Sequence, residues 1–122
     1  MKNSEKSGDE VLIMQKGLLL VGHGSSLPYN QELLENTAAM IAKKYPYFMI
    51  KCGFMRINKP TIEESLDAFS REPISSLVVV PLFLAKGIHI DKDIPANIGL
   101  PEGTRKGVLS MNGKMIPMVY AD

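Results

Sequence analysis

The chain is poor in the residues that mark several common protein classes. Its 122 residues include one cysteine, Cys52, and no tryptophan. A single cysteine excludes a disulfide within the chain and fits a reducing compartment, so we expect a cytoplasmic protein. The formal net charge is only +1, which gives no global attraction to nucleic acid or to an anionic membrane. We therefore expect no nucleic-acid partner and no membrane partner.

Long hydrophobic runs are also absent. The longest, Leu77–Ala85, is far shorter than a membrane span and contains Pro81. The N-terminal segment MKNSEKSGDE is polar and carries both signs of charge, so we expect no secretory signal peptide there. We expect a flexible tail over residues 1–16 and a single domain over 17–122, which is long enough to bury a core.

Apolar residues recur along the chain with spacings typical first of a strand and then of a helix. Gly17–Val21 is apolar without alternation, which is typical of a strand covered on both faces. Helical spacing predicts helices over 29–45 and from 62 to about 71, the second preceded by the capping-box sequence TIEE. Strands are further predicted over 48–55, 74–84 and 114–120, with a short helix over 93–98 and a surface excursion over 99–113.

This order of elements predicts an α/β fold built on a parallel sheet. The predicted strands number four, because the region 99–113 is rich in glycine and charge. Such sheets bind their ligands beyond the carboxyl ends of the strands. Residues that directly follow a predicted strand are therefore the first candidates for a site.

Both histidines of the chain follow predicted strands. His23 follows the first strand in LLLVGHGSS, and His89 follows the third in LAKGIHIDKDIP, so both are expected at the carboxyl edge of the sheet. Neutral imidazole binds cobalt, nickel, iron and zinc, and it accepts protons near neutral pH. Two histidines favour an open site over a closed zinc site, which needs four ligands. Gly22 and Gly24 are expected to leave room for a ligand beside His23.

Other interpretations of GHGSS stay open on these residues alone. A nucleophile elbow requires Gly-x-Ser-x-Gly, a spacing that Ser25 does not have. The N–H groups of residues 24–26 could hold a phosphate at the start of a helix, although no Walker lysine follows. Cations near predicted strand ends are modest evidence for an anionic ligand: Arg56, Lys59, Lys86 and Lys92.

Three segments together resemble a known family. They are LLLVGHGSSLPYNQELL, GFMRINKPTIEESL and VVVPLFLAKGIHIDKDIP, and the resemblance runs in order from Gly17 to about Tyr120. The chain is similar to the small archaeal CbiX-type chelatases. These are sirohydrochlorin cobaltochelatases, also implicated in nickel insertion on the route to coenzyme F430.

The resemblance implies a chelatase-like three-layer α/β domain with a four-stranded parallel sheet, in a homodimer with a shared cleft. It implies insertion of Co2+ or Ni2+ into sirohydrochlorin without a nucleotide, on the way to cobalamin or coenzyme F430. The metal-binding and catalytic histidines carry over to His23 and His89, and His89 is the preferred general base. The candidate substrate-binding residues are Gly24, Ser25, Arg56, Lys86, Gly87 and Lys92.

Two features depart from the family pattern. Arg56 stands in the segment F-M-E-x-x-x-P-T, where members usually have an acidic residue. The chain ends in MVYAD, so the C-terminal helix of the family is expected to be missing. These departures favour, as the alternative, a non-catalytic protein that binds or carries a metal or a tetrapyrrole.

Overall fold

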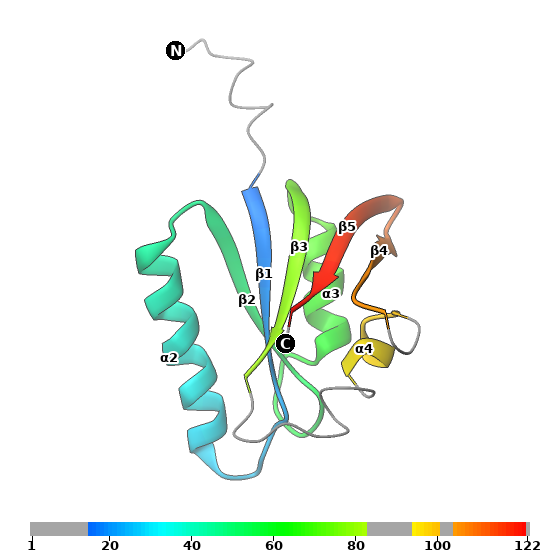
Figure 1. Cartoon of the computed structure of the whole chain (residues 1–122). Coiled ribbons are helices and arrows are strands. Elements are labelled where there is room, and N and C mark those ends of the chain that lie inside the picture. The colour runs from blue at the N-terminus through cyan, green and yellow to red at the C-terminus, as the bar shows by residue number, and fades with distance from the viewer. Residues whose placement is uncertain (1–14, 83–93, 101–103, 122) are drawn as a thin grey trace.

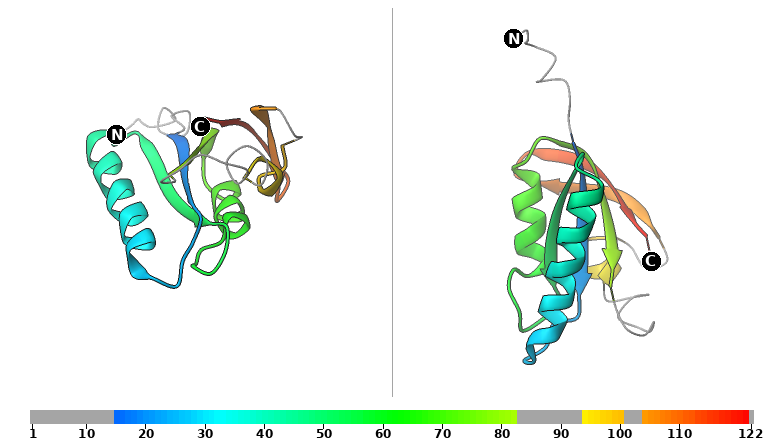
Figure 2. Two further views of the ribbon diagram at one scale, coloured as in Figure 1. Left: turned by 60° about the horizontal axis from the view of Figure 1, so that its bottom comes forward. Right: turned by 90° about the vertical axis from the view of Figure 1, so that its left-hand side faces the viewer.

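The computed structural model describes residues 15–82, 94–100 and 104–121. Within these residues a sheet of five strands runs in the order β2-β1-β3-β5-β4. The helices α2 and α3 lie on opposite faces of this sheet (Figures 1 and 2). The elements are β1 (Gln15–Gly22), α2 (Pro28–Lys44), β2 (Phe48–Phe54), α3 (Ile62–Ser70), β3 (Ile74–Pro81), α4 (Ile94–Asn97), β4 (Lys106–Met111) and β5 (Lys114–Tyr120).

The strand β1 has a neighbour on each side and a core on each face. It pairs in parallel with β2 and with β3, and β3 pairs in parallel with β5. Leu19 and Val21 point into the core under α3, whereas Leu18 and Leu20 belong to a smaller cluster under α2. The unbroken apolar run therefore follows from burial on both faces, as predicted. The strand begins at Gln15, inside the segment 1–16 that was expected to be a tail.

The expected surface excursion over 99–113 is wrong in its second half. Residues 106–111 form β4, which pairs antiparallel with β5, so the sheet has five strands among the described residues and not four parallel ones. Asn112 and Gly113 make the hairpin turn with φ of 53° and 77°, the conformation that Asn-Gly turns adopt. Only Leu109 of this edge strand is fully buried, which is why its composition did not resemble a strand.

The predicted capping box begins α3. The hydroxyl of Thr61 accepts a hydrogen bond from the N–H of Glu64 over 3.1 Å, and the carboxylate of Glu64 accepts one from the N–H of Thr61 over 2.8 Å. Ile62, Leu66 and Phe69 then enter the larger core, each at most 3% exposed. The helix α3 is therefore fixed both by its cap and by its apolar stripe.

The helix α2 is less buried than its apolar spacing predicts. Leu34 is its one fully buried residue, and Ala38 and Ile41 are partly buried against it. Leu33 and Tyr45 belong to the same predicted stripe but are 45% and 48% exposed. None of the described helices is long and apolar enough to cross a membrane.

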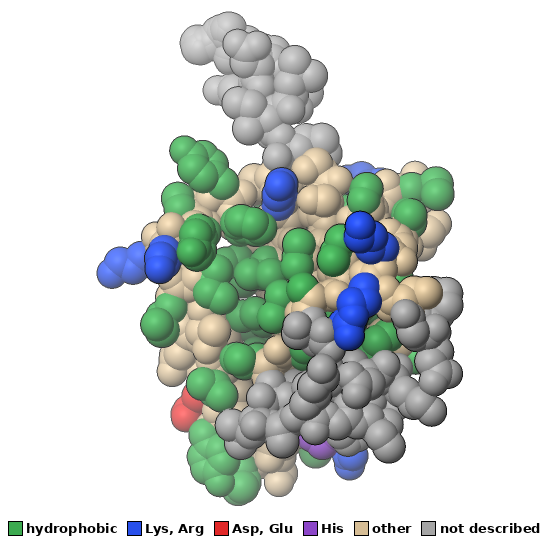
Figure 3. Space-filling view, in the orientation of Figure 1, with side chains coloured by type: hydrophobic (Ala, Val, Ile, Leu, Met, Phe, Trp, Pro, Cys, Tyr) green, Lys and Arg blue, Asp and Glu red, His purple; other side chains and the backbone are tan. Residues whose placement is uncertain are grey.

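The face of the sheet that carries α2 is only partly covered by described residues. The contacts of α2 are with β1 and β2, and hydrophobic side chains gather in the hollow beside it (Figure 3). On the same face, Val78 and Val80 of β3 are partly buried and Val119 of β5 is 37% exposed. The described chain thus has one well-filled core under α3 and one open apolar face.

Candidate functional site

The carboxyl ends of β1 and β2 meet at one edge of the sheet. Gly22 and Phe54 are paired across the two strands, so the loops that begin with His23 and with Met55 and Arg56 start beside each other. Figure 1 shows the loops after β1 and β2 at the same end of the sheet. The N–H of Met55 donates to the carbonyl of Gly22 over 3.0 Å and joins the two loops at their start. His23 therefore lies where parallel sheets bind ligands, as its position after a strand predicts.

His23 is held against the protein. Its side chain is partly buried, and its Nε2 atom is buried from solvent. The second predicted histidine, His89, lies outside the described residues, together with Lys86, Gly87 and Lys92. Among the residues that the structure describes, no group of three histidine, cysteine, aspartate or glutamate side chains forms a metal site. A paired histidine site stays a prediction.

The glycines on either side of His23 allow other residues of the same chain to pack closely against the backbone there. A Cβ on Gly24 would collide with the carbonyl oxygen of Arg56, and Gly24 has a φ of 94°, which a residue with a side chain rarely adopts. A Cβ on Gly22 would lie 3.2 Å from side-chain atoms of Leu34 and Phe54. The room that these glycines were expected to leave for a ligand is occupied here by protein atoms.

Two of the backbone donors of the loop after β1, at Gly24 and Ser25, are already used. The N–H of Gly24 donates to Oδ1 of Asn30 over 3.1 Å, and the N–H of Ser25 donates to Oδ1 of Asn58 over 2.8 Å. The hydroxyl of Ser25 accepts from the N–H of Leu27 over 3.1 Å and turns the chain into α2. A phosphate cradle needs such N–H groups to be available. This geometry argues against the phosphate-binding interpretation.

The loop after β2 carries two cations with different surroundings. Lys59 lies 3.3 Å from the carboxylate of Glu64 in α3. The pKa of Glu64 is lowered, first by the hydrogen bond from the N–H of Thr61 and then by Lys59. Arg56 is exposed on the same loop. Because Lys59 is engaged by α3, Arg56 is the better candidate of the two for an anionic ligand.

Comparison with known proteins identifies the family. The CbiX family model matches residues 17–115, which include β1 from Gly17 onward, the loop that follows it and both histidines. The chain belongs to the CbiX family of chelatases. The resemblance of its three segments to this family is therefore confirmed.

Curated relatives of this CbiX chain are archaeal proteins named sirohydrochlorin cobaltochelatase. The relative from Methanococcoides burtonii is 43% identical over 104 residues, which cover 85% of this chain and 79% of the relative. The relative from Methanosarcina acetivorans is 42% identical over 105 residues, with coverages of 86% and 80%. The similarity therefore extends over most of both chains.

Solved chelatase structures share the fold of this CbiX chain. A protein from Marinobacter aquaeolei VT8, described as CbiX of cobalamin biosynthesis, has a TM-score of 0.63 at 25% identity and covers 88% of this chain and 80% of its own. The sirohydrochlorin chelatase SirB from Bacillus subtilis subspecies spizizenii, solved in complex with cobalt, has a TM-score of 0.62 at 28% identity. This chain spans only 36% of that SirB chain. The chelatase-like α/β fold is confirmed.

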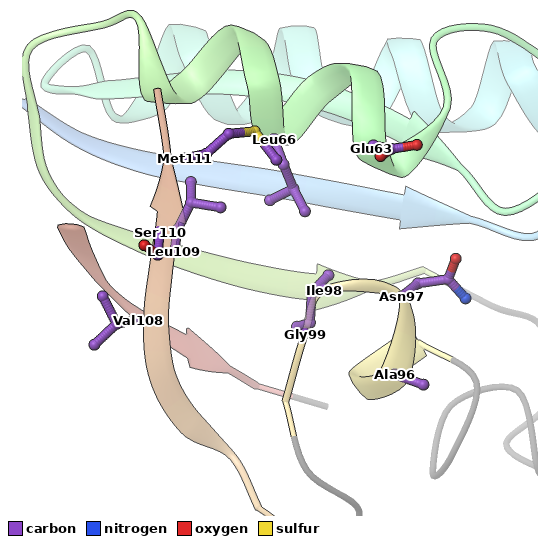
Figure 4. Close-up of a pocket in the computed structure, with 10 residues that line it drawn as sticks. All are labelled: Glu63, Leu66, Ala96, Asn97, Ile98, Gly99, Val108, Leu109, Ser110 and Met111. Carbon is purple, nitrogen blue, oxygen red and sulfur yellow. The ribbon is translucent and has the colours of Figure 1, made fainter. Parts of the chain in front are cut away.

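A pocket of this CbiX chain lies apart from His23. It has a volume of about 570 Å³ and lies between α3, α4 and β4, where Glu63, Leu66, Asn97 and Met111 contribute to its lining (Figure 4). None of the candidate site residues that the structure describes lines it. The pocket is therefore not part of the site at the end of β1.

Sequence reasoning missed the two asparagines that hold the loop of His23. Asn58 lies in RINKP, a composition typical of a turn, and Asn30 lies in the first turn of α2. Their hydrogen-bond partners are 33 and 6 residues away in the sequence. Only the general tendency of asparagine to bond to backbone groups could have indicated them, and it does not identify the partner.

Proposed function

We propose that this CbiX chain inserts Co2+ or Ni2+ into sirohydrochlorin without using a nucleotide. The observation that carries the proposal is His23 at the carboxyl edge of the sheet, in a chain whose archaeal relatives are named sirohydrochlorin cobaltochelatase. SirB, solved with cobalt, supports cobalt as a metal for this fold. Nickel is included because imidazole binds both metals and the affinity order favours nickel only modestly.

In the proposed reaction His23 and His89 hold the metal through imidazole nitrogens and leave coordination positions open to the tetrapyrrole. Insertion forms bonds from the metal to the nitrogens of the macrocycle, breaks the bonds from the metal to the two imidazoles and releases two pyrrole protons. Once the metal has left His89, its imidazole accepts one of these protons as general base, and solvent water takes the other. Arg56, Lys86 and Lys92 pair with carboxylates of the substrate and hold the macrocycle over the metal. Backbone atoms of Gly24, Ser25 and Gly87 complete the surface that contacts the substrate.

The two metals lead to different products in this proposal. Cobalt insertion supplies a precursor for cobalamin, and nickel insertion supplies one for coenzyme F430. We place the reaction in the cytoplasm, where a lone cysteine such as Cys52 stays reduced. Initial rates with each metal at equal concentration decide which product the enzyme makes faster.

We propose further that two copies form a homodimer whose sites face a shared cleft. The SirB protein solved with cobalt is a longer chain, of which this chain spans 36%. Two copies would therefore supply what one SirB chain supplies. The open apolar face with Val78, Val80 and Val119 adds support, because surfaces of this kind often become interfaces. Sedimentation is expected to give twice 13.5 kDa, and the mass of one chain would contradict the dimer.

Metal insertion is tested with the purified chain, sirohydrochlorin and Co2+, by following the absorption bands of the tetrapyrrole. We expect many turnovers per chain. His23→Ala is expected to lower the initial rate by about 100-fold or more, since even groups that only support a metal ligand are worth 10- to 100-fold. Tyr47→Ala is the control, because Tyr47 is 82% exposed and precedes β2 at the opposite edge of the sheet.

The same experiment separates a chelatase from a carrier. A carrier changes the spectrum by at most one equivalent per chain and then stops. A stoichiometric change in the wild type would therefore contradict the proposed function and favour the non-catalytic alternative. A His23→Ala chain that retains the full rate would contradict the role of His23.

A further inference from the structure

Two asparagine side chains hold the backbone directly after His23. The N–H of Gly24 donates to Oδ1 of Asn30, and the N–H of Ser25 donates to Oδ1 of Asn58. Because a backbone N–H can only donate, each asparagine must present its oxygen at this point. The residues that follow His23 are thus fixed from α2 on one side and from the loop after β2 on the other.

The loop that carries Asn58 has a strained and well-defined shape. The N–H of Asn58 donates to the carbonyl of Arg56 over 2.7 Å, and Ile57 between them has a φ of 66°. Together these features make a γ-turn with positive φ at its centre, an arrangement that is rare and strained. It is especially uncommon for a β-branched residue. The carbonyl of Arg56 packs against Gly24, and the side-chain oxygen of Asn58 accepts from the N–H of Ser25. Both contacts between the two loops therefore come from this turn.

Asn58 also connects this loop to the start of α2. Its Nδ2 donates to Oε1 of Gln31 over 3.3 Å while its oxygen holds the loop after β1. On the other side of His23, the carbonyl of Gly22 accepts from the N–H of Met55. The backbone both before and after His23 is therefore tied to the loop after β2. Strain of the kind seen in that loop persists only where its neighbours determine it, and it gathers at functional sites.

We propose that Asn58 is a positioning residue for metal insertion and fixes the direction in which His23 presents its imidazole. This inference rests on the proposed function, in which His23 holds the metal. Asn58 acts through the backbone of Ser25 and needs no contact with the metal or the tetrapyrrole. Residues that orient a metal ligand in this way are worth 10- to 100-fold in metal affinity or activity.

Asn58→Ala tests the proposal through three measurements. Co2+ affinity, by calorimetry, and kcat for insertion are each expected to fall by about tenfold or more, with KM for sirohydrochlorin unchanged. Without metal, the amide hydrogen of Ser25 is expected to exchange at least about tenfold faster by NMR, since its acceptor is lost. Asn58→Asp keeps an oxygen that accepts from Ser25 and is expected to restore most of each loss.

Asn112→Gly is the matched control. The amide of Asn112 also ties a turn to another element, donating to Asp67 over 2.8 Å and to the hydroxyl of Ser70, but it lies between β4 and β5. Glycine accepts the φ of 53° at this position, so the change removes only the amide contacts. We expect lower stability with unchanged Co2+ affinity and insertion rate. If the Asn58→Ala chain does not fold, Asn30→Ala is the second variant, with the same losses of Co2+ affinity and kcat expected. The faster amide exchange is then expected at Gly24, whose acceptor Asn30 provides.

The outcomes separate this inference from the proposed function. A folded Asn58→Ala chain with wild-type Co2+ affinity and wild-type exchange at Ser25 overturns the inference. Equal loss of Co2+ affinity in Asn112→Gly also overturns it, because stability alone would then explain the effect. If the wild type binds Co2+ but inserts no metal, the proposed function fails, and the Co2+ affinities still decide the role of Asn58. A wild type that binds no Co2+ overturns both.

Discussion

At the scale of the residue, Gly24 shows how a backbone contact determines the shape of the site. The carbonyl of Arg56 occupies the place that a Cβ would take on Gly24, and the backbone there has a φ of 94°. Any other residue would strain its own backbone and also push the loop after β2 away. The glycine in GHGS therefore matters for the contact between two loops as well as for any ligand.

Gly24→Ala is expected to destabilise the protein by about 2–5 kcal/mol. The left-handed backbone contributes about 1–2 kcal/mol, and the collision with Arg56 contributes about 1–3 kcal/mol. Denaturant unfolding followed by circular dichroism measures the loss. The rate of metal insertion is expected to fall with it, because the loop of His23 shifts.

Gly113→Ala is the matched control for this substitution. Gly113 also has a positive φ, 77°, but nothing lies within 4 Å of a Cβ there. Its loss is therefore expected to be the backbone term alone, about 1–2 kcal/mol, with insertion unchanged. If both alanine variants lose the same free energy of unfolding, the collision between a Cβ at position 24 and the carbonyl of Arg56 does not contribute to the loss.

Arg56 is exposed on the loop beside His23, and its guanidinium is proposed to pair with substrate carboxylates. Arg56→Gln is expected to raise KM for sirohydrochlorin about fivefold to tenfold, which corresponds to the loss of a hydrogen bond worth roughly 1–1.5 kcal/mol. Because only the side chain changes, kcat and thermal stability are expected to stay near those of the wild type. A fall in kcat with KM unchanged would contradict a role in substrate binding and indicate one in the metal step.

At the scale of the element, the start of α3 couples stability to pH. The pKa of Glu64 is lowered, first by the N–H of Thr61 and then by Lys59. A carboxyl group whose pKa is lower in the folded state adds stability above its unfolded pKa, and this stability is lost as the pH falls through the folded value. The pKa of Asp67 is lowered as well, first by Asn112 and then by Arg71. The stability that Glu64 and Asp67 contribute at neutral pH is therefore lost as the solution becomes acidic.

Glu64→Gln is expected to weaken this acid dependence. Glutamine still accepts the hydrogen bond from Thr61 at the cap, but it has no charge and does not titrate. Melting temperatures from pH 7 down to about pH 3 are expected to fall less steeply than in the wild type, with the difference arising below roughly pH 5. Lys59 remains, so the test isolates the carboxylate. Parallel curves for the two proteins would contradict the contribution of Glu64.

The elements that could be predicted are those whose cause is local. The capping box of Thr61 and Glu64 and the apolar run of β1 depend on near neighbours in the sequence, and both are confirmed. The strand β4 was missed because, among the described residues, it is paired on one side only and Leu109 is its one fully buried side chain. The Asn-Gly pair at 112–113 is a sequence signal for a hairpin turn, and it could have indicated β4 and β5.

The same division applies to the candidate site. The position of His23 follows from the end of an apolar run and from the rule for parallel sheets, so the sequence was sufficient for it. Asn58 could not be predicted, because its contact with Ser25 spans 33 residues and depends on how two loops meet. The exposed side of α2 could not be predicted either. Leu33 and Leu34 belong to one apolar stripe, and which part of the stripe is buried depends on what packs against the helix.

At the scale of the whole molecule, the two faces of the sheet differ in how well they are covered. The face under α3 holds a continuous core, with Leu77 and Val79 of β3 fully buried. The face under α2 has a smaller cluster, in which Val80 is partly buried. Because adjacent residues of a strand point to opposite faces, β3 samples both environments within two positions.

Val79→Ala and Val80→Ala make the same chemical change on these two faces. Val79→Ala is expected to lower the free energy of unfolding by about 2–3 kcal/mol, from lost burial and a residual cavity. Val80→Ala is expected to lower it by about 1 kcal/mol or less, since its methyl groups already touch solvent in part. Urea unfolding of both variants at one low protein concentration measures the difference.

Equal losses at Val79 and Val80 would contradict an open face, because they would require that Val80 is as well covered in solution as Val79. Repeating the measurement at several protein concentrations then shows whether a second copy covers Val80. A second copy stabilises the folded state by mass action, so the loss at Val80 would grow as the concentration is raised above the dissociation constant of the dimer. Val79 is buried within a single chain, so most of the free energy of unfolding that is lost in Val79→Ala does not depend on a second copy. This loss is therefore expected to change less with protein concentration. This comparison therefore tests whether the proposed homodimer uses the apolar face beside α2.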